Sequence, residues 1–277
     1  MQKNHSQTWF CFTRKSRLLL EFTPAKLNFH MPTAALAIVD AGIGGLGTYR
    51  AIKARCDIPI MYFADGGFEP YGEVPTHDLR KRLQSIFEFL YAQGASKIAV
   101  ACNAASSALP QDNNVEGIIR HGVEAIKRSG MQHIGLIGGT RTIRSQSYAR
   151  LLRTENIRLT QRIAQPLSLH VEAGTLDGDE LHQDLARILG PLENAEAVLL
   201  ACTHYPAISD QIRRHLSSTT ELIDPAELLA DWVLKNWQFE HSIRSDLWFT
   251  SGDTAKLIEN GRRAFGVSIE NPEKIII

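Results

Sequence analysis

Short apolar runs alternate with longer amphipathic stretches over most of the chain. Five of these runs are almost entirely apolar, which is typical of strands buried on both faces, and they cover residues 35–39, 58–63, 97–101, 133–137 and 197–201. A sixth strand is expected over 245–250, directly before Ser251-Gly252-Asp253.

The stretches between the runs repeat apolar residues at helical spacing. In residues 77–91 the spacing is carried by Leu79, Leu83, Ile86, Phe87 and Leu90. After Gly178 it is carried by Leu181, Leu185 and Leu189. Further helices are expected over 206–216, 225–237 and 254–265, and the first two open with a proline, which suits a first helical turn. Strands that alternate with helices predict an α/β fold with mostly parallel sheets.

Residues 1–30 differ from everything after them. They carry five basic residues against Glu21 alone and show no clean period. We expect an N-terminal extension outside the catalytic fold. Two interpretations stay open: translation starts at Met31, or the segment is a regulatory arm.

Composition narrows the classes of partner. The chain has 277 residues, enough for one or two domains, and its 30 basic and 30 acidic residues give a formal charge of zero. Without a net positive charge, the protein is not expected to bind nucleic acid or an anionic membrane. A small molecule is the expected partner. No apolar run approaches the ~18 residues of a membrane span, and no secretory signal is visible, so we expect a cytoplasmic protein.

The four cysteines lie far apart, without a C-x-x-C pair, so neither a zinc knuckle nor a disulfide framework is indicated. They are Cys11, Cys56, Cys102 and Cys202, and reduced thiols are expected. No metal site is expected either, because His204 has no second ligand at suitable spacing.

Three strands end in small and polar residues, in the order Asp40-Ala41-Gly42, Cys102-Asn103-Ala104 and Cys202-Thr203-His204. Ligands of open α/β sheets bind at the carboxyl ends of strands, so a site is expected there. A lone cysteine would be read as a buried apolar residue. Two cysteines, each expected at the start of a helix whose dipole favours a thiolate, indicate reactive thiols, and His204 stands close enough in sequence to assist proton transfer.

The first of these strand ends also allows a nucleotide-binding interpretation. Residues 42–47 satisfy G-x-G-x-x-G, and Asp65 stands about where a ribose-binding acid is expected, which would make the chain an NAD-dependent oxidoreductase. Against this, Asp40 would face the pyrophosphate, and both cysteines would have no role. The glycines are explained at least as well by a tight turn and close packing, without any bound nucleotide.

Five motifs in order resemble those of glutamate racemases in the aspartate/glutamate racemase superfamily. Members show D-S-G-x-G-G-L, P-Y-G, C-N-T, V-E-x-G and G-C-T-H-Y-P, and the counterparts here are residues 40–46, 70–72, 102–104, 171–174 and 201–206. The resemblance implies two pseudo-symmetric α/β lobes, residues 31–124 plus 225–277 and residues 125–224, with the active site between them.

The resemblance also implies cofactor-independent racemisation of L- and D-glutamate, which supplies D-glutamate for peptidoglycan, by an enzyme that can be a homodimer. One cysteine would remove the α-proton, and the other would supply a new proton on the opposite face. Asp40 would assist Cys102, while Glu172 and His204 would assist Cys202. The implied substrate-binding positions are Ala41, Tyr71, Gly72, Asn103, Ala104, Thr142 and Thr203, and Asp65 matches an acidic position of the family.

Three departures affect the substrate rather than the proton transfer. Ala41 replaces the serine of D-S-G, Ala104 replaces the threonine of C-N-T, and Gly139 stands where a threonine is usual. Each replacement removes a hydroxyl that could hydrogen-bond the substrate. The loss of one neutral hydrogen bond weakens binding by ~0.5–1.5 kcal/mol. Two alternatives therefore stay open: a racemase or isomerase of another α-chiral acid, and a catalytically idle binding homologue.

Overall fold

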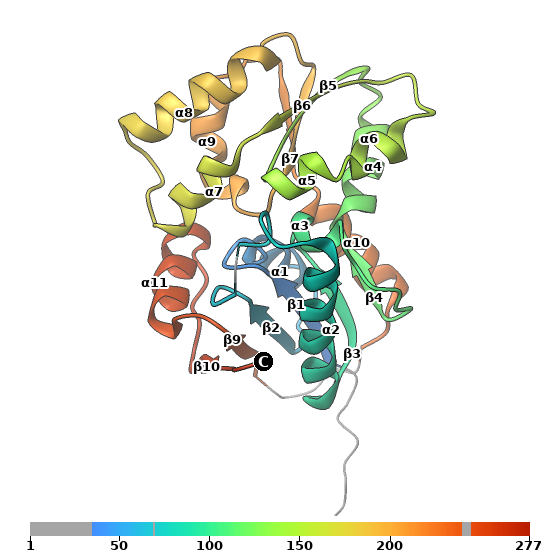
Figure 1. Cartoon of the computed structure of the whole chain (residues 1–277), viewed down its shortest axis with the longest axis vertical. Coiled ribbons are helices and arrows are strands. Elements are labelled where there is room, and N and C mark those ends of the chain that lie inside the picture. The colour runs from blue at the N-terminus through green and yellow to red at the C-terminus, as the bar shows by residue number, and fades with distance from the viewer. Residues whose placement is uncertain (1–34, 69, 240–244) are drawn as a thin grey trace, which may run out of the picture. The chain divides into compact units, whose positions relative to one another are not determined.

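A computed structural model describes residues 35–68, 70–239 and 245–277, which form two parallel sheets. The first sheet has six strands in the order β10-β9-β2-β1-β3-β4 (Figure 1). Its strands are β1 (Ala35–Asp40), β2 (Ile60–Ala64), β3 (Ala95–Val100), β4 (Val115–Gly117), β9 (Leu247–Thr250) and β10 (Glu273–Lys274). The prediction for residues 1–30, and Cys11 with it, lies outside the described residues.

Helices cover both faces of the first sheet because the side chains of each strand alternate between two cores. Leu36 and Ile38 face a core that includes α1 (Leu46–Lys53), α10 (Ala226–Asn236) and α11 (Thr254–Phe265). Ala37 and Val39 face the opposite core, which is closed by α2 (Thr76–Ala92). The β1 strand lies between β2 and β3, and all its residues are buried, which explains its unbroken apolar run.

The second sheet has four strands in the order β6-β5-β7-β8. They are β5 (His133–Gly138), β6 (Arg158–Ile163), β7 (Ala197–Ala201) and β8 (Glu221–Ile223). Ile134 and Leu136 pack with α4 (Ile118–Ser129) and α6 (Ser147–Leu152), whereas Ile137 packs with α7 (Gln165–Glu172) and α8 (Asp179–Leu189). The shorter elements are α3 (Asn103–Ser106), α5 (Thr140–Arg144), η1 (Gly190–Leu192), η2 (Tyr205–Ile208) and α9 (Ser209–Arg213).

The prediction of an α/β fold with parallel sheets is confirmed, since every strand pair of the described residues is parallel. The six expected strands form: β7 has the expected ends, and the other five have ends shifted by one or two residues. The helix expected over 206–216 does not form as one element, because Ile208 has a non-helical backbone between η2 and α9. The assignment of residues 31–124 plus 225–277 and 125–224 to two lobes stays a prediction.

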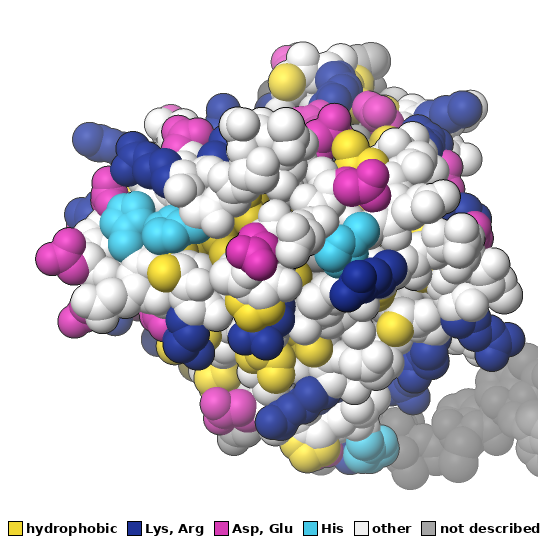
Figure 2. Space-filling model, turned by 90° about the horizontal axis from the view of Figure 1, so that it is seen from above, with side chains coloured by type: hydrophobic (Ala, Val, Ile, Leu, Met, Phe, Trp, Pro, Cys, Tyr) yellow, Lys and Arg dark blue, Asp and Glu magenta, His cyan; other side chains and the backbone are white. Residues whose placement is uncertain are grey.

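Basic and acidic side chains are interspersed over the face of the protein seen in Figure 2, without a continuous basic region on that face. None of the helices in the described residues has the length and apolar character needed to cross a bilayer.

Candidate active site

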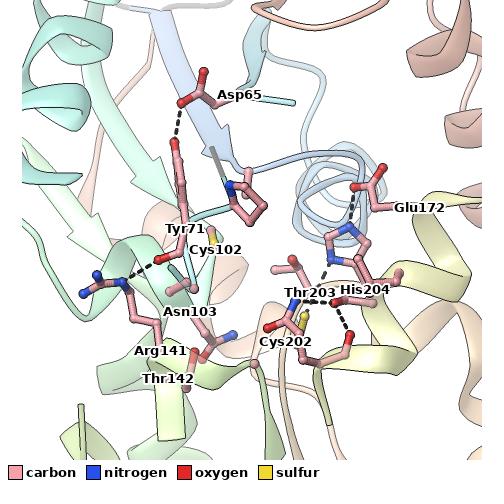
Figure 3. Close-up of a pocket in the computed structure, with 18 of the residues that line it drawn as sticks. Asp65, Tyr71, Cys102, Asn103, Arg141, Thr142, Glu172, Cys202, Thr203 and His204 are labelled. Atoms are coloured by element: carbon pink, nitrogen blue, oxygen red, sulfur yellow. Dashed lines mark hydrogen bonds and ion pairs between the residues drawn. The ribbon is translucent and has the colours of Figure 1, made fainter. Parts of the chain in front are cut away.

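A cavity of about 350 Å³ lies where the carboxyl ends of strands from both sheets meet. Ala41 follows β1, Cys102 follows β3, Gly139 follows β5, and Cys202 follows β7. Parallel strands place these ends at one edge of each sheet, so residues far apart in sequence line one cavity (Figure 3). The cavity also contains the other predicted positions Tyr71, Gly72, Asn103, Ala104, Thr142, Glu172, Thr203 and His204.

Cys102 caps the N-terminus of the short helix α3. Its Sγ accepts a hydrogen bond from the Ala105 N–H at 3.5 Å, and the side chain is buried. Burial raises the pKa of the Cys102 thiol well above its usual value, and the nearby Asp40 carboxylate raises this pKa further. The expected lowering of this pKa is wrong, because burial and Asp40 outweigh the hydrogen bond from the Ala105 N–H, which acts in the lowering direction.

Asp40 lies behind the cavity wall and is fully buried. Its Oδ1 accepts from the Gly42 N–H at 3.0 Å, and its Oδ2 accepts from the Thr203 hydroxyl at 3.0 Å. Burial raises the pKa of Asp40 to about 6, against the lowering effect of His204 and of both hydrogen bonds. Among the described residues, no hydrogen bond joins Asp40 to Cys102, so any influence on that thiol acts through charge.

Cys202, His204 and Glu172 form a chain of polar contacts. The His204 Nδ1 lies 3.6 Å from the Cys202 Sγ, and the His204 Nε2 lies 2.5 Å from the Glu172 Oε1. Burial alone would lower the pKa of His204, but the Glu172 carboxylate and the Cys202 sulfur raise it well above its usual value. Burial opposes ionisation of Glu172 too, and His204 nevertheless lowers the pKa of this carboxyl. These contacts can hold His204 as an imidazolium beside the Cys202 sulfur.

No α-helix starts directly after Cys202, which is followed by a turn and by the 3-10 helix η2. A helix dipole therefore does not act on this thiol as expected. His204 supplies the nearby positive charge instead.

Asn103 is held in one orientation by a buried tyrosine. The Tyr148 hydroxyl donates to the Asn103 Oδ1 at 2.7 Å, and both residues are buried. The Asn103 Nδ2 is buried and has no hydrogen-bond partner among the described residues. This unpaired donor lies on a residue that lines the cavity, where a ligand oxygen could accept from it.

Asp65 is engaged in an ion pair rather than free for a ligand. The Arg82 guanidinium contacts both of its carboxylate oxygens, at 2.5 and 2.9 Å. The Tyr71 hydroxyl donates to Asp65 at 2.8 Å, and the Ser251 hydroxyl donates at 2.6 Å. Asp65 therefore anchors Tyr71 at the cavity and does not stand as an unpaired ribose-binding acid.

The glycine loop packs against other parts of the protein. A Cβ atom at Gly42 would collide with the Glu172 carboxylate, and one at Gly44 would lie 2.8 Å from the backbone carbon of Thr203. At Gly45 a Cβ would lie 2.8 Å from the Cβ of Asp40. Side chains of this protein fill the space above the loop, which supports the close-packing interpretation of its glycines.

Arg141 is a cavity residue that the sequence pattern did not single out. It follows β5, belongs to α5 and lies between Gly139 and Thr142, which the family resemblance singles out. Its Nε donates to the Tyr71 carbonyl at 2.6 Å, its Nη1 donates to the Thr76 hydroxyl at 3.1 Å, and its Nη2 donates to the Val74 carbonyl. A charged residue next to the predicted Thr142 was the signal that could have found it.

In the part of the chain that the structure describes, no three or more His, Cys, Asp or Glu side chains are grouped so as to hold a metal ion. Within the same residues, Cys56, Cys102 and Cys202 are free thiols.

Comparison with known proteins identifies the family. The Asp/Glu/Hydantoin racemase family model matches residues 51–233. A glutamate racemase of Desulforudis audaxviator is 32% identical over 210 residues, which are 71% of this chain and 76% of that protein.

Two crystal structures of glutamate racemases are similar to this chain. The protein from Bacillus anthracis has a TM-score of 0.80 at 24% identity, covers 90% of this chain and 99% of its own, and thus shows the same fold. The Thermus thermophilus protein, in complex with β-chloro-D-alanine, has a TM-score of 0.76 at 27% identity over 88% of this chain and 97% of its own. The resemblance indicated by the five motifs is confirmed, and the chain belongs to the Asp/Glu/Hydantoin racemase family.

Proposed function

We propose that this protein is an amino-acid racemase that interconverts L- and D-glutamate without a cofactor. The observation that carries the proposal is the pair of thiols, Cys102 and Cys202, which line one cavity from the ends of strands in different sheets. Family membership and the glutamate racemases among the relatives support the reaction and the substrate.

The reaction needs two acid–base groups because inversion moves a proton from one face of the α-carbon to the other. A thiolate on one side takes the α-proton and becomes a thiol. The thiol on the other side gives its proton to the opposite face of the carbanion and becomes a thiolate. No net proton is gained or lost, and the two cysteines exchange protonation states in each turnover.

The charges around the two sulfurs suggest how the cycle begins. Burial and Asp40 hold Cys102 in the protonated form, so this residue is proposed as the first proton donor. The imidazolium of His204, paired with Glu172, is proposed to stabilise the Cys202 thiolate, which is the first base. Asp40 is proposed to assist Cys102 by favouring the return of its thiolate to the protonated form, because the two negative charges repel each other.

Asn103 and Thr203, together with the backbone of Tyr71 and Gly72, are proposed to hold the substrate, and Ala41, Ala104 and Thr142 are proposed to shape its site. We extend the proposal to a cytoplasmic role in supplying D-glutamate for peptidoglycan. A homodimer stays a prediction.

Deuterium exchange tests the reaction class and the substrate together. The protein is incubated with single L- or D-amino acids in deuterium oxide, and the α-proton signal is followed by NMR. Loss of this signal for glutamate, with formation of the other enantiomer, is expected. Exchange with another acid alone would replace glutamate as the substrate, and no exchange with any acid would favour an idle binding homologue.

Single Cys→Ser variants test the two-thiol mechanism. Cys102→Ser and Cys202→Ser should each abolish racemisation, because a serine hydroxyl is neither a useful base nor a matched acid near neutral pH. Each variant keeps one thiol. With a substrate analogue that carries a leaving group on the β-carbon, deprotonation can end in elimination, so each variant should consume one enantiomer. Consumption of the same enantiomer by both variants would refute the mechanism.

A further inference from the structure

Arg141 brings a positive charge to the wall of the cavity from the side of the second sheet. Its three hydrogen-bond acceptors, the Tyr71 and Val74 carbonyls and the Thr76 hydroxyl, are all neutral. Among the described residues, no carboxylate lies within 4.0 Å of its guanidinium. The charge of this cavity residue is therefore not balanced by a direct ion pair.

The acidic side chains that line the cavity are already paired with other cations. Asp65 is paired with Arg82, and Glu172 is paired with His204. A zwitterionic amino acid with a neutral side chain would bring no net charge to the cavity. An amino acid with a second carboxylate would bring one negative charge, and among the described residues that line the cavity Arg141 is the cation that no carboxylate pairs with.

Arg141 also determines how one backbone segment faces the cavity. Its bond to the Tyr71 carbonyl turns that oxygen toward α5 (Figure 3). In a trans peptide the carbonyl and the following N–H point in opposite directions, so the Gly72 N–H points away from Arg141. Neither the Tyr71 nor the Gly72 N–H donates to an atom of the described residues, although both residues line the cavity.

The Gly72 N–H, whose peptide is polarised by the guanidinium, and the neighbouring Tyr71 N–H together form a place for an anion. The Tyr71 side chain is fixed independently by its bond to Asp65, so the segment is held from both ends. A Cβ at Gly72 would meet nothing closer than 3.5 Å, at the Gln165 Oε1, so the segment is not packed tightly by neighbouring side chains at this point. Its orientation depends on the hydrogen bonds of Tyr71.

We propose that Arg141 is a specificity-determining residue that positions the Tyr71–Gly72 peptide and provides the positive charge for the side-chain carboxylate of the substrate. It selects an acidic amino acid over its neutral isostere. This role rests on the proposed racemase function and adds to it the residue that recognises the second carboxylate.

The test compares L-glutamate with L-glutamine, which has the same shape without the charge. Racemisation of both is measured for the parent protein, Arg141→Met and Arg141→Lys. Arg144→Met is the matched control, because Arg144 is an exposed residue of the same helix and does not line the cavity. Thermal unfolding of each variant verifies that the fold is intact.

Arg141→Met should raise the KM for glutamate by roughly tenfold or more, with kcat changed by less than about threefold, because the Tyr71–Gly72 peptide loses its anchor and the cavity wall loses a positive charge, and both losses affect binding. The preference for glutamate over glutamine should fall by a similar factor. Arg141→Lys should recover part of the preference, and Arg144→Met should change nothing. An equal loss for glutamate and glutamine, or a loss confined to kcat, would overturn the proposal and leave Arg141 as a structural tether.

A binding experiment separates this proposal from the proposed function. Isothermal titration calorimetry with glutarate and with its monoamide measures recognition of the second carboxylate without any reaction. The parent should bind glutarate more tightly, and Arg141→Met should remove the preference. If the parent catalyses no racemisation but shows this preference, the proposed function fails and the carboxylate site stands. If the parent does not distinguish glutarate from the monoamide, the role of Arg141 is refuted.

Discussion

Replacement of Asp40 by Asn should stabilise the protein at neutral pH and impair its chemistry. Asp40 is fully buried, and its oxygens accept hydrogen bonds from Gly42 and Thr203. An asparagine can keep the bond from the Gly42 N–H through its own Oδ1, and the Thr203 hydroxyl can turn to accept from the new amide. The substitution therefore removes the buried charge and preserves the shape.

The magnitude follows from the pKa of Asp40, which burial raises from 3.8 to about 6. Below pH 4, both the folded and the unfolded state bind the proton. Between pH 4 and pH 6 only the folded state binds it, so the free energy of unfolding falls by up to about 1.4 kcal/mol per pH unit. Above pH 6 both states are ionised, and the accumulated loss is about 3 kcal/mol. Asn does not titrate and avoids this loss.

Urea unfolding of the parent and of Asp40→Asn at several pH values between 4 and 8 measures the effect. The difference in free energy of unfolding should be small at pH 4 and should grow to about 3 kcal/mol in favour of the variant above pH 6. Asp253→Asn is a control of opposite sign. The exposed Asp253 accepts hydrogen bonds from the Ala255 and Lys256 N–H groups, which lower its pKa. Its contribution to the free energy of unfolding is therefore lost as the pH falls. A difference for Asp40→Asn that stays constant with pH would refute the reasoning.

Three further outcomes are expected. Tyr148→Phe should cost about 1–3 kcal/mol in urea unfolding, because the buried Asn103 Oδ1 loses its donor, and an unchanged stability would contradict this. Gly44→Ala should cost about 1–3 kcal/mol, since its Cβ would meet Thr203, and a neutral effect in thermal unfolding would show that the loop can shift. The double variant Ala41→Ser/Ala104→Thr should lower the KM for glutamate by roughly tenfold, and an unchanged or raised KM would indicate that the alanines suit a different substrate.

The sequence predicts those elements that are buried on both sides or are strongly amphipathic. The interior strand β1 and the helix α2 carry this signal because their burial leaves no freedom in the pattern. The edge strand β6 has no fully buried residue, so no apolar run indicates it. The two-residue strand β10 is fully exposed and gives no pattern at all. The periodicity of apolar residues reflects burial, so it does not indicate elements that are largely exposed.

At the candidate site, the sequence predicts which residues gather but not how they pair. The strand ends indicate that Cys102 and Cys202 come together, since parallel strands finish at one edge. The hydrogen bond from Thr203 to Asp40 joins residues from two different sheets, and no spacing rule predicts it. The contacts of Arg141 could not be predicted for the same reason, because its acceptors lie about seventy residues earlier in the chain.

Three contacts at the cavity connect the segments of one sheet to those of the other. Asp40, at the end of β1, accepts from Thr203, which follows β7. Glu172, in α7, accepts from the Ile43 N–H at 3.2 Å as well as from His204. Arg141, in α5, donates to the Tyr71 carbonyl, which follows β2.

Every one of these contacts uses a residue with a proposed role in proton transfer or substrate binding. Two buried or half-buried carboxylates and one guanidinium thus have a second effect, because they hold the carboxyl ends of the two sheets together around the cavity. Replacement of any of them by an apolar residue changes the local charge and loosens this connection at the same time. The charge-preserving Arg141→Lys and the shape-preserving Asp40→Asn separate the two effects, since the first keeps the charge but not the fork of hydrogen bonds, and the second keeps the bonds but not the charge.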